Sequence, residues 1–295
     1  MTAPAAPSAT LRARSEAEAA RLPALLARAQ HLAGAVLPGQ HGRRRAGQGD
    51  DFWQYRPVQQ GDQRRQIDWR RSARSDAEFV REREWQIAQT VMLWVDSSAS
   101  MQFSSGAHLP EKADRAQLLA LAAAILLDRG GERVGLTGHT LPPRRGAAQI
   151  ARLARALAGT GEPTDYGVPD ARGLPSQSHA VFLSDFLGDL VPVSDALTFA
   201  ADRGVRGALV QVLDPAEEAF PYRGRAIFES IGGTLSHETR KADDLRSRYL
   251  ARLAERKAEL RQICGVTGWQ YLCHHTDASP QVALLWLHAA LGGGR

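Results

Sequence analysis

From residue 90 onward the chain alternates between short apolar runs and segments whose apolar residues recur at helical spacing. Short apolar runs predict buried strands, whereas apolar residues three and four apart predict helices that pack on them. The predicted strands cover residues 90–96, 133–139, 180–185, 207–213 and 268–274. The predicted helices cover residues 111–129, 147–158, 190–203, 238–264 and 279–291. Strands separated by helices require crossover connections, so we expect an α/β fold with a doubly wound, mostly parallel sheet.

The first 89 residues predict an extension of helical and irregular structure. Residues 1–36 combine an Ala/Pro/Ser-rich tail, which we expect to be disordered, with a helix from about residue 15. Residues 37–89 begin as a Gly- and Arg-rich loop and end in a charged strand, Phe79–Gln89, that we expect at a sheet edge. We therefore divide the chain into residues 1–36, residues 37–89 and a main domain of residues 90–295.

Composition excludes several classes of protein. With 43% hydrophobic and 23% charged residues, the 295-residue chain has an ordinary globular composition, and its net charge of +5 is mild. Two cysteines do not make a disulfide framework. No stretch reaches the roughly 18 apolar residues of a membrane span, and the N-terminus has no apolar signal core. We therefore expect a cytoplasmic protein without a membrane span.

Oxygen-bearing side chains gather directly after the first predicted strand of the main domain. Asp96, Ser98 and Ser100 follow its apolar run, and ligands of open α/β sheets bind at this edge. Three hard oxygen donors of low charge suit Mg²⁺ that keeps waters and takes an outside oxygen as its last ligand. Asp185, at the end of another predicted strand, and Thr164, in a loop before a crossover, are further candidates.

Each of these residues also has a simpler interpretation. Serine and aspartate after a strand are common N-caps of the next helix, although the ordered set of five favours a metal site. Thr160 lies close to Thr164 and is an alternative to it. Mn²⁺ accepts the same octahedral oxygen ligands, so the metal is predicted to be Mg²⁺ or Mn²⁺.

Two elements of the sequence resemble known families. Asp96-x-Ser98-x-Ser100 resembles the metal-ion-dependent adhesion site of von Willebrand factor type A domains. An upstream element contains Arg56, Gly61, Asp62, Arg65, Ile67, Asp68 and Trp69, and two later elements are Leu213-Asp214-Pro215-Ala216-Glu217 and Tyr271-x5-Asp277. These elements resemble the prokaryotic "domain of unknown function 58" family, which joins the upstream segment to a von Willebrand factor type A-like domain.

The resemblance implies a von Willebrand factor type A-like fold and a binding function. In the adhesion-site pattern, Asp96, Ser98 and Ser100 bind Mg²⁺ directly or through water, and Thr164 and Asp185 take the remaining two protein positions. An acidic residue of a partner supplies the sixth ligand. The family resemblance further implies work beside a MoxR-type AAA+ ATPase, with this chain as the adaptor that recognises a client. We thus expect a non-enzymatic, Mg²⁺-dependent protein-interaction module.

The upstream signature allows two interpretations of its own. It could be a docking surface for a partner or an anion, or an internal network in which Asp68 holds an arginine and Trp69 packs on the core. Residues 41–85 contain 11 arginines against 8 acidic residues, a balance that favours ion pairs over a phosphate-binding patch. Nucleic-acid binding through this region is therefore a weaker alternative.

The alternative from a different class is a metal-dependent hydrolase, acting on phosphate esters, in which Asp96 or Asp185 has a chemical role. It needs a general acid or base beside the metal, and only Asp165 is available. Neither a Gly-x-Ser-x-Gly elbow nor a P-loop is present. His274 and His275 follow Cys273, but no second ligand pair has matching spacing, so we interpret all three as packing or strand-end polar groups.

Overall fold

The computed structural model describes residues 22–36, 43–47, 51–59, 62–64, 67–74, 77–139, 141–159, 164–222, 224, 226–229, 236–239 and 242–292. The chain divides into two compact units. The small unit comprises residues 40–89, and the main unit comprises residues 1–39 together with residues 90–295. Each unit is described by itself.

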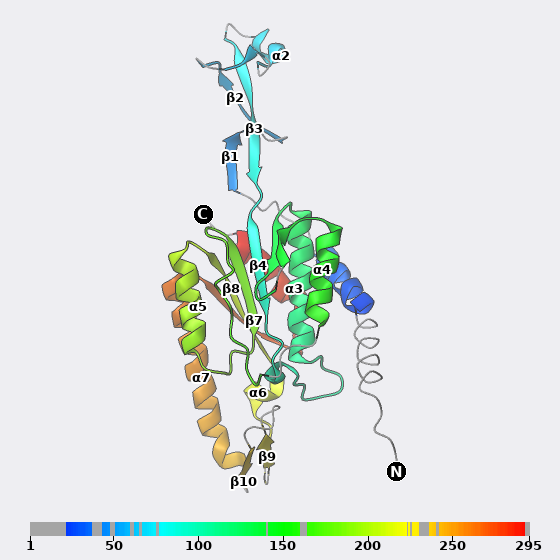
Figure 1. The fold of residues 1–295 in the computed structure, drawn as a ribbon, viewed down its shortest axis with the longest axis vertical. Helices are drawn as coiled ribbons and strands as arrows, with labels where there is room; N and C mark the ends of the chain where they lie inside the picture. The colour runs from blue at the N-terminus through cyan, green and yellow to red at the C-terminus, as the bar shows by residue number, and fades with distance from the viewer. Residues whose placement is uncertain are drawn as a thin grey trace, which may run out of the picture. The chain divides into compact units, whose positions relative to one another are not determined.

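The small unit is built on a three-stranded antiparallel sheet. Its order is β1 (Arg43–Gly47), β3 (Phe79–Ile87), β2 (Asp51–Pro57), and the short helix α2 (Trp69–Ser72) precedes β3 (Figure 1). The expectation of an edge strand at residues 79–89 is wrong, because β3 lies between the other two strands. The predicted loop at residues 37–50 is also wrong where β1 forms. An antiparallel sheet can leave one face in water, so a charged strand need not lie at its edge.

The main unit contains a six-stranded, mostly parallel sheet, and the α/β prediction is confirmed at this level. Its spatial order is β11 (Gln270–His275), β8 (Arg206–Leu213), β7 (His179–Ser184), β4 (Thr90–Val95), β5 (Arg133–Leu136), β6 (Leu141–Arg144). All neighbouring strands pair in parallel except β5 and β6, which are antiparallel. The sequence pattern did not predict β6. Its two prolines cannot donate ladder hydrogen bonds, which suits a strand at the edge of the sheet.

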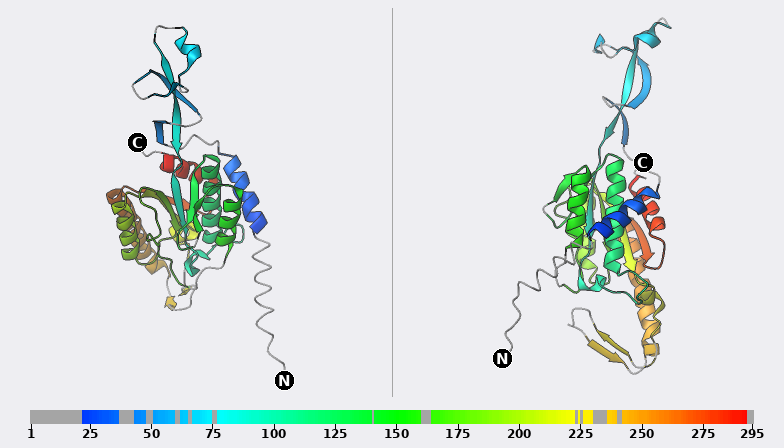
Figure 2. Two further views of the ribbon diagram at one scale, coloured as in Figure 1. Left: turned by 45° about the horizontal axis from the view of Figure 1, so that its top comes forward. Right: turned by 90° about the vertical axis from the view of Figure 1, so that its right-hand side faces the viewer.

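Helices cover both faces of this sheet (Figures 1 and 2). One face carries α3 (Lys112–Arg129), α4 (Ala147–Ala158), α8 (Pro280–Gly292) and an N-terminal helix over residues 22–34, and the other carries α5 (Val191–Asp202) and α7 (Ala242–Thr267). Strand β4 serves both layers because successive side chains point to opposite faces. Val91 and Leu93 join the core beneath α3, whereas Met92 and Trp94 join the core beneath α5 and α7.

Two further elements were not predicted from the pattern. Strands β9 (Ala226–Glu229) and β10 (Ser236–Thr239) form an antiparallel hairpin, so α7 begins four residues later than the predicted helix. The short helix α6 (Pro215–Ala219) directly follows β8. Because β4, β7 and β8 are parallel, their carboxyl ends lie at the same edge of the sheet, and α6 starts at this edge.

Candidate functional site

The loop after β4 buries a carboxylate at the carboxyl edge of the sheet. Asp96 is only 3% exposed, and its backbone N–H continues the ladder by donating to the Leu183 carbonyl at 2.9 Å. Its Oδ1 accepts from the Ser98 backbone N–H at 2.8 Å, and its Oδ2 accepts from the Ser184 hydroxyl at 2.6 Å. Asp96 is thus held in one orientation by β4, β7 and its own loop.

The two serines of the loop present their hydroxyls to each other. Ser98 Oγ and Ser100 Oγ are 3.3 Å apart, beside the short 3-10 helix η2 (Ala99–Met101). Ser98 precedes η2, yet within the described part of the chain its side chain makes no capping hydrogen bond. The capping interpretation therefore does not account for the Ser98 hydroxyl.

The segment after α4 crosses directly over this loop. The Thr164 carbonyl accepts from the Ala99 backbone N–H at 2.9 Å, and the Asp165 carbonyl accepts from Ser100 at 3.0 Å. Gly167 passes so close to Asp96 that an added Cβ would lie 2.2 Å from Oδ1. Thr164 is thus placed beside the loop, and Gly167 is a site residue that sequence reasoning missed. Thr160 lies outside the described residues.

Asp185 has a cationic partner that the sequence did not reveal. Its Oδ2 accepts from the Lys112 ammonium at 2.9 Å, and its Oδ1 accepts from the Leu187 backbone N–H at 3.0 Å. Lys112 and Asp185 are each 1% exposed. The Asp185 carbonyl also accepts from the Gln211 side chain at 2.8 Å. Each carboxylate oxygen of Asp185 thus has a partner, as do those of Asp96, and the role of Asp185 as a direct metal ligand stays a prediction.

Lys112 also joins α6 to the site. Its ammonium donates to Glu217 Oε1 at 2.6 Å, and Glu217 Oε2 accepts from the Asp214 backbone N–H within the capping box that starts α6. Burial alone would lower the pKa of Lys112, but Asp185 and Glu217 raise it above its ordinary value. Burial raises the pKa of Glu217, and Lys112 opposes this shift. Lys112 is therefore a charged internal cation, and Glu217 gives the Leu213-Asp214-Pro215-Ala216-Glu217 element a structural role.

Asp96, Ser98 and Ser100 offer the oxygen ligands that a hard divalent cation prefers. With Mg–O bonds of about 2.1 Å, adjacent ligands of an octahedral shell lie roughly 3 Å apart. The 3.3 Å separation of the two hydroxyl oxygens is close to that value. These residues could hold Mg²⁺ with waters in the remaining positions.

The signature residues of the small unit build a capped helical turn. Asp68 Oδ1 accepts from the Arg71 backbone N–H at 3.0 Å, and its Oδ2 accepts from Tyr55 at 3.3 Å. The Arg71 guanidinium lies 4.6 Å from the Tyr55 ring centroid. Trp69 is 56% exposed, so the prediction that it packs on the core is wrong. The Asp62 carboxylate accepts from the Gln59 backbone N–H at 2.7 Å.

The remaining signature residues lie beyond what the structure describes in detail. Gly61 and Arg65 lie outside the described residues, and Arg56 is described only through its backbone, which pairs with Val80 in the sheet. Their assignment as partner-binding or structural residues stays a prediction.

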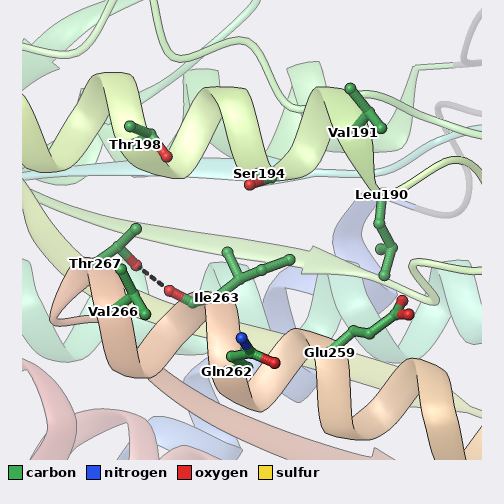
Figure 3. Close-up of a pocket in the computed structure, with 9 residues that line it drawn as sticks. All are labelled: Leu190, Val191, Ser194, Thr198, Glu259, Gln262, Ile263, Val266 and Thr267. Carbon is green, nitrogen blue, oxygen red and sulfur yellow. Dashed lines mark hydrogen bonds between the residues drawn. The ribbon is translucent and has the colours of Figure 1, made fainter.

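A groove of about 400 Å³ lies between α5 and α7 (Figure 3). Exposed apolar residues such as Val191 and Val266 line it, and Glu259 is the only ionisable residue among the nine that form its wall. The Thr267 hydroxyl in this wall donates to the Ile263 carbonyl at 2.7 Å. The wall thus brings together no set of groups for acid–base or metal chemistry.

The fold and the site define a mixed α/β protein with a mostly parallel sheet, helices on both faces and a carboxylate–hydroxyl cluster at its carboxyl edge. The family described as protein of unknown function DUF58 matches residues 54–259, and the chain belongs to this family. Uncharacterized proteins of Mycobacterium bovis and Mycobacterium tuberculosis are 28% identical to it over 257 residues, which is 82% of this chain and 80% of each relative.

Solved structures show more distant likeness. The conserved hypothetical protein BatB from Bacteroides thetaiotaomicron is 14% identical, with a TM-score of 0.40, over 70% of this chain and 100% of its own. An aerotolerance-related membrane protein from Bacteroides fragilis is also 14% identical, with a TM-score of 0.43 and the same coverage. A membrane spanning protein from Vibrio fischeri is 18% identical, with a TM-score of 0.21, over 68% of this chain and 96% of its own.

The expectation of a cytoplasmic protein is contradicted by these structures, because two of them are described as membrane proteins. Those descriptions belong to the two proteins themselves, and they give this chain no cellular location. Within the described ranges, no helix combines the length and the apolar character needed to cross a bilayer.

Proposed function

We propose that the chain is a non-enzymatic, Mg²⁺-dependent protein-interaction module with a von Willebrand factor type A-like main unit. The observation that carries this proposal is the pair of neighbouring hydroxyls of Ser98 and Ser100 beside the buried Asp96 carboxylate. Asp96, Ser98, Ser100 and Thr164 would hold the metal at the edge of the sheet. The metal, when bound, supplies a positive charge and an open coordination position for a carboxylate of another protein.

The low charge of this ligand set favours binding of an acidic partner. Serine and threonine hydroxyls orient a cation without neutralising it, and Lys112 already compensates the charge of Asp185. A metal held mainly by Asp96 and hydroxyls would keep residual positive charge. An aspartate or glutamate of a client protein would then be attracted to it.

We extend the proposal to the partner that the family resemblance implies. A MoxR-type AAA+ ATPase would supply mechanical work, and this chain would recognise the client through its metal. The signature segment would form the contact with the ATPase. Its Trp69 is exposed, and Asp68 caps the short helix α2, so this segment can serve as a docking surface.

The hydrolase alternative gains no support from the geometry. Asp165 contacts the loop through its backbone carbonyl, and the Lys112 ammonium is buried between two carboxylates. Held by two carboxylates, the Lys112 ammonium is not available as a general base for water bound beside Ser98 and Ser100.

Calorimetric titration of the full chain with Mg²⁺ tests the site. We expect Asp96→Ala and Ser98→Ala each to weaken Mg²⁺ binding by at least about tenfold, since each removes a ligand. Ser97→Ala changes a neighbouring hydroxyl outside the ligand set and should bind Mg²⁺ like the wild type. Equal Mg²⁺ affinity in all four proteins would refute the site. A purified MoxR-type ATPase from the source organism should bind the wild type and Asp96→Ala equally well. Capture of the client should need both Asp96 and Mg²⁺.

A further inference from the structure

We propose a second metal site in the main unit, for a soft divalent cation such as Zn²⁺, formed by Glu218, Cys273 and His275. The site is separate from the Asp96 loop and does not depend on the function proposed above. It brings together a carboxylate, a thiol and an imidazole, which is a donor set that suits Zn²⁺ and is unsuited to Mg²⁺.

The three side chains come from two elements that fix their relative positions. Cys273 and His275 are two residues apart on β11, so both point to the same face of this edge strand. Glu218 comes from the last turn of α6. One ligand atom from each residue lies within 4.8 Å of the other two, and His275 Nε2 contacts Glu218 Oε2 directly.

Only a small rearrangement would close this triangle around a metal. Zn–S bonds of about 2.3 Å and Zn–N or Zn–O bonds of about 2.1 Å place tetrahedral ligand atoms roughly 3.5 Å apart. The Glu218 and His275 side chains are 44% and 31% exposed, so they can adjust and admit an ion from solvent. Three protein ligands leave a fourth position for water, as in accessible rather than purely structural zinc sites.

A cation already lies at this cluster. The Lys257 ammonium from α7 is 2.5 Å from Glu218 Oε1, and its positive charge also acts on Cys273. The cluster thus attracts positive charge, and Lys257 is its internal competitor for a metal. On metal binding the Cys273 thiol would release its proton to solvent, and Lys257 would turn away from Glu218 toward water. Burial raises the pKa of Cys273, so without a metal its thiol is protonated at neutral pH.

Titration of the EDTA-treated full chain with Co²⁺ tests the site, because a cobalt–thiolate bond gives a charge-transfer absorption in the near ultraviolet. We expect one such site in the wild type, displaced by Zn²⁺. Cys273→Ser should abolish the absorption, and His275→Gln should weaken Co²⁺ binding by at least about 100-fold. Lys257→Met removes the competitor and should tighten Co²⁺ binding by about tenfold.

Two matched controls distinguish this site from the second thiol of the chain and from the Mg²⁺ site. Cys264→Ala removes the other cysteine, which is 1% exposed, and should leave the cobalt–thiolate absorption unchanged. Asp96→Ala should also leave it unchanged, so failure here and failure of the Mg²⁺ site are distinguishable. The proposal is overturned if the wild type gives no cobalt–thiolate absorption, or if that absorption persists in Cys273→Ser. Circular dichroism of each variant confirms that the fold is retained.

Discussion

Glu217 and Glu218, adjacent on α6, belong to two charged clusters that differ in their access to water. Glu217 contacts Lys112, a lysine 1% exposed that also binds the equally buried Asp185. Glu218, whose side chain is 44% exposed, contacts the partly exposed His275 and Lys257, a lysine that is itself only 8% exposed. The first ammonium is fixed by two carboxylates away from solvent, whereas the second has one carboxylate partner that water can replace.

This difference in the burial of the carboxylate partners separates a structural cation from an exchangeable one. Removing one member of a buried ion pair leaves an uncompensated charge in the protein interior, so Lys112 cannot give way to a metal without a large penalty. Lys257 can give way to a metal, because its partner Glu218 is 44% exposed and its own flexible side chain can turn toward water. A metal at the Asp96 loop should therefore bind beside Lys112, while a metal at Cys273 should bind in place of Lys257.

Replacing Lys112 should give the largest effect. In Lys112→Met the carboxylates of Asp185 and Glu217 stay buried without their cation, and we expect the free energy of unfolding to fall by about 3–5 kcal/mol. The matched change Lys257→Met leaves behind only Glu218, a carboxylate that is 44% exposed and can be hydrated, so it should lower the free energy of unfolding less, by about 1 kcal/mol. Urea denaturation at neutral pH measures both variants.

A neutralised triple variant sharpens this test. Lys112→Met combined with Asp185→Asn and Glu217→Gln removes the stranded charges and should regain part of the lost stability. Similar losses for Lys112→Met and Lys257→Met would contradict the distinction between the two clusters.

His274 gives the next largest effect, through pH. It lies between Cys273 and His275 on β11 but is buried, and its Nε2 lies 2.9 Å from the Arg115 guanidinium. Burial, with the positive charges of Arg115 and His275, lowers the pKa of His274 to about 4, although Asp277 opposes this shift. The unfolded chain binds this proton near pH 6.5. The stability that His274 contributes is thus present above pH 6.5 and is lost as pH falls toward 4.

Denaturation in EDTA at pH 7 and at about pH 4.5 measures this loss, which should be on the order of 3 kcal/mol when fully developed. His274→Gln keeps an acceptor for Arg115 but cannot titrate, so its free energy of unfolding should fall less over the same interval. Equal losses in the variant and the wild type would show that His274 does not carry this pH dependence.

Much of the fold was predictable because the main sheet is covered on both faces. Its strands are nearly continuous apolar runs bounded by polar turns, and α4 begins and ends where its periodicity predicts. The small unit was predicted poorly because its antiparallel strands are charged, so their pairing leaves no apolar run to detect. The hairpin β9–β10 was missed because four-residue strands carry little periodicity.

The candidate site was predictable only where its residues follow strands. Asp96 and Asp185 directly succeed β4 and β7, so the sheet topology alone brings their backbones to one edge. Lys112 and Glu217 come from the starts of helices and are 105 residues apart in the sequence. Nothing in the local sequence shows that their side chains are in contact. The cluster of Cys273 and His275 was set aside because Glu218, its third member, is distant in sequence and had no signal of its own.

Gly167→Ala should give the smallest of these effects and tests how rigidly the Asp96 loop is held. The added Cβ would lie 2.2 Å from Asp96 Oδ1, and Asp96 cannot turn aside easily because Ser98 and Ser184 both donate to it. We expect a loss of about 1–3 kcal/mol in the free energy of unfolding, together with weaker Mg²⁺ binding. Gly173→Ala is the matched control, because no atom lies within 4 Å of its added Cβ. If Gly167→Ala is as stable as Gly173→Ala and binds Mg²⁺ equally well, the Asp96 loop is more adaptable than its hydrogen bonds indicate. The contrast between a fixed site at Asp96 and an adjustable site at Cys273 would then lose its basis.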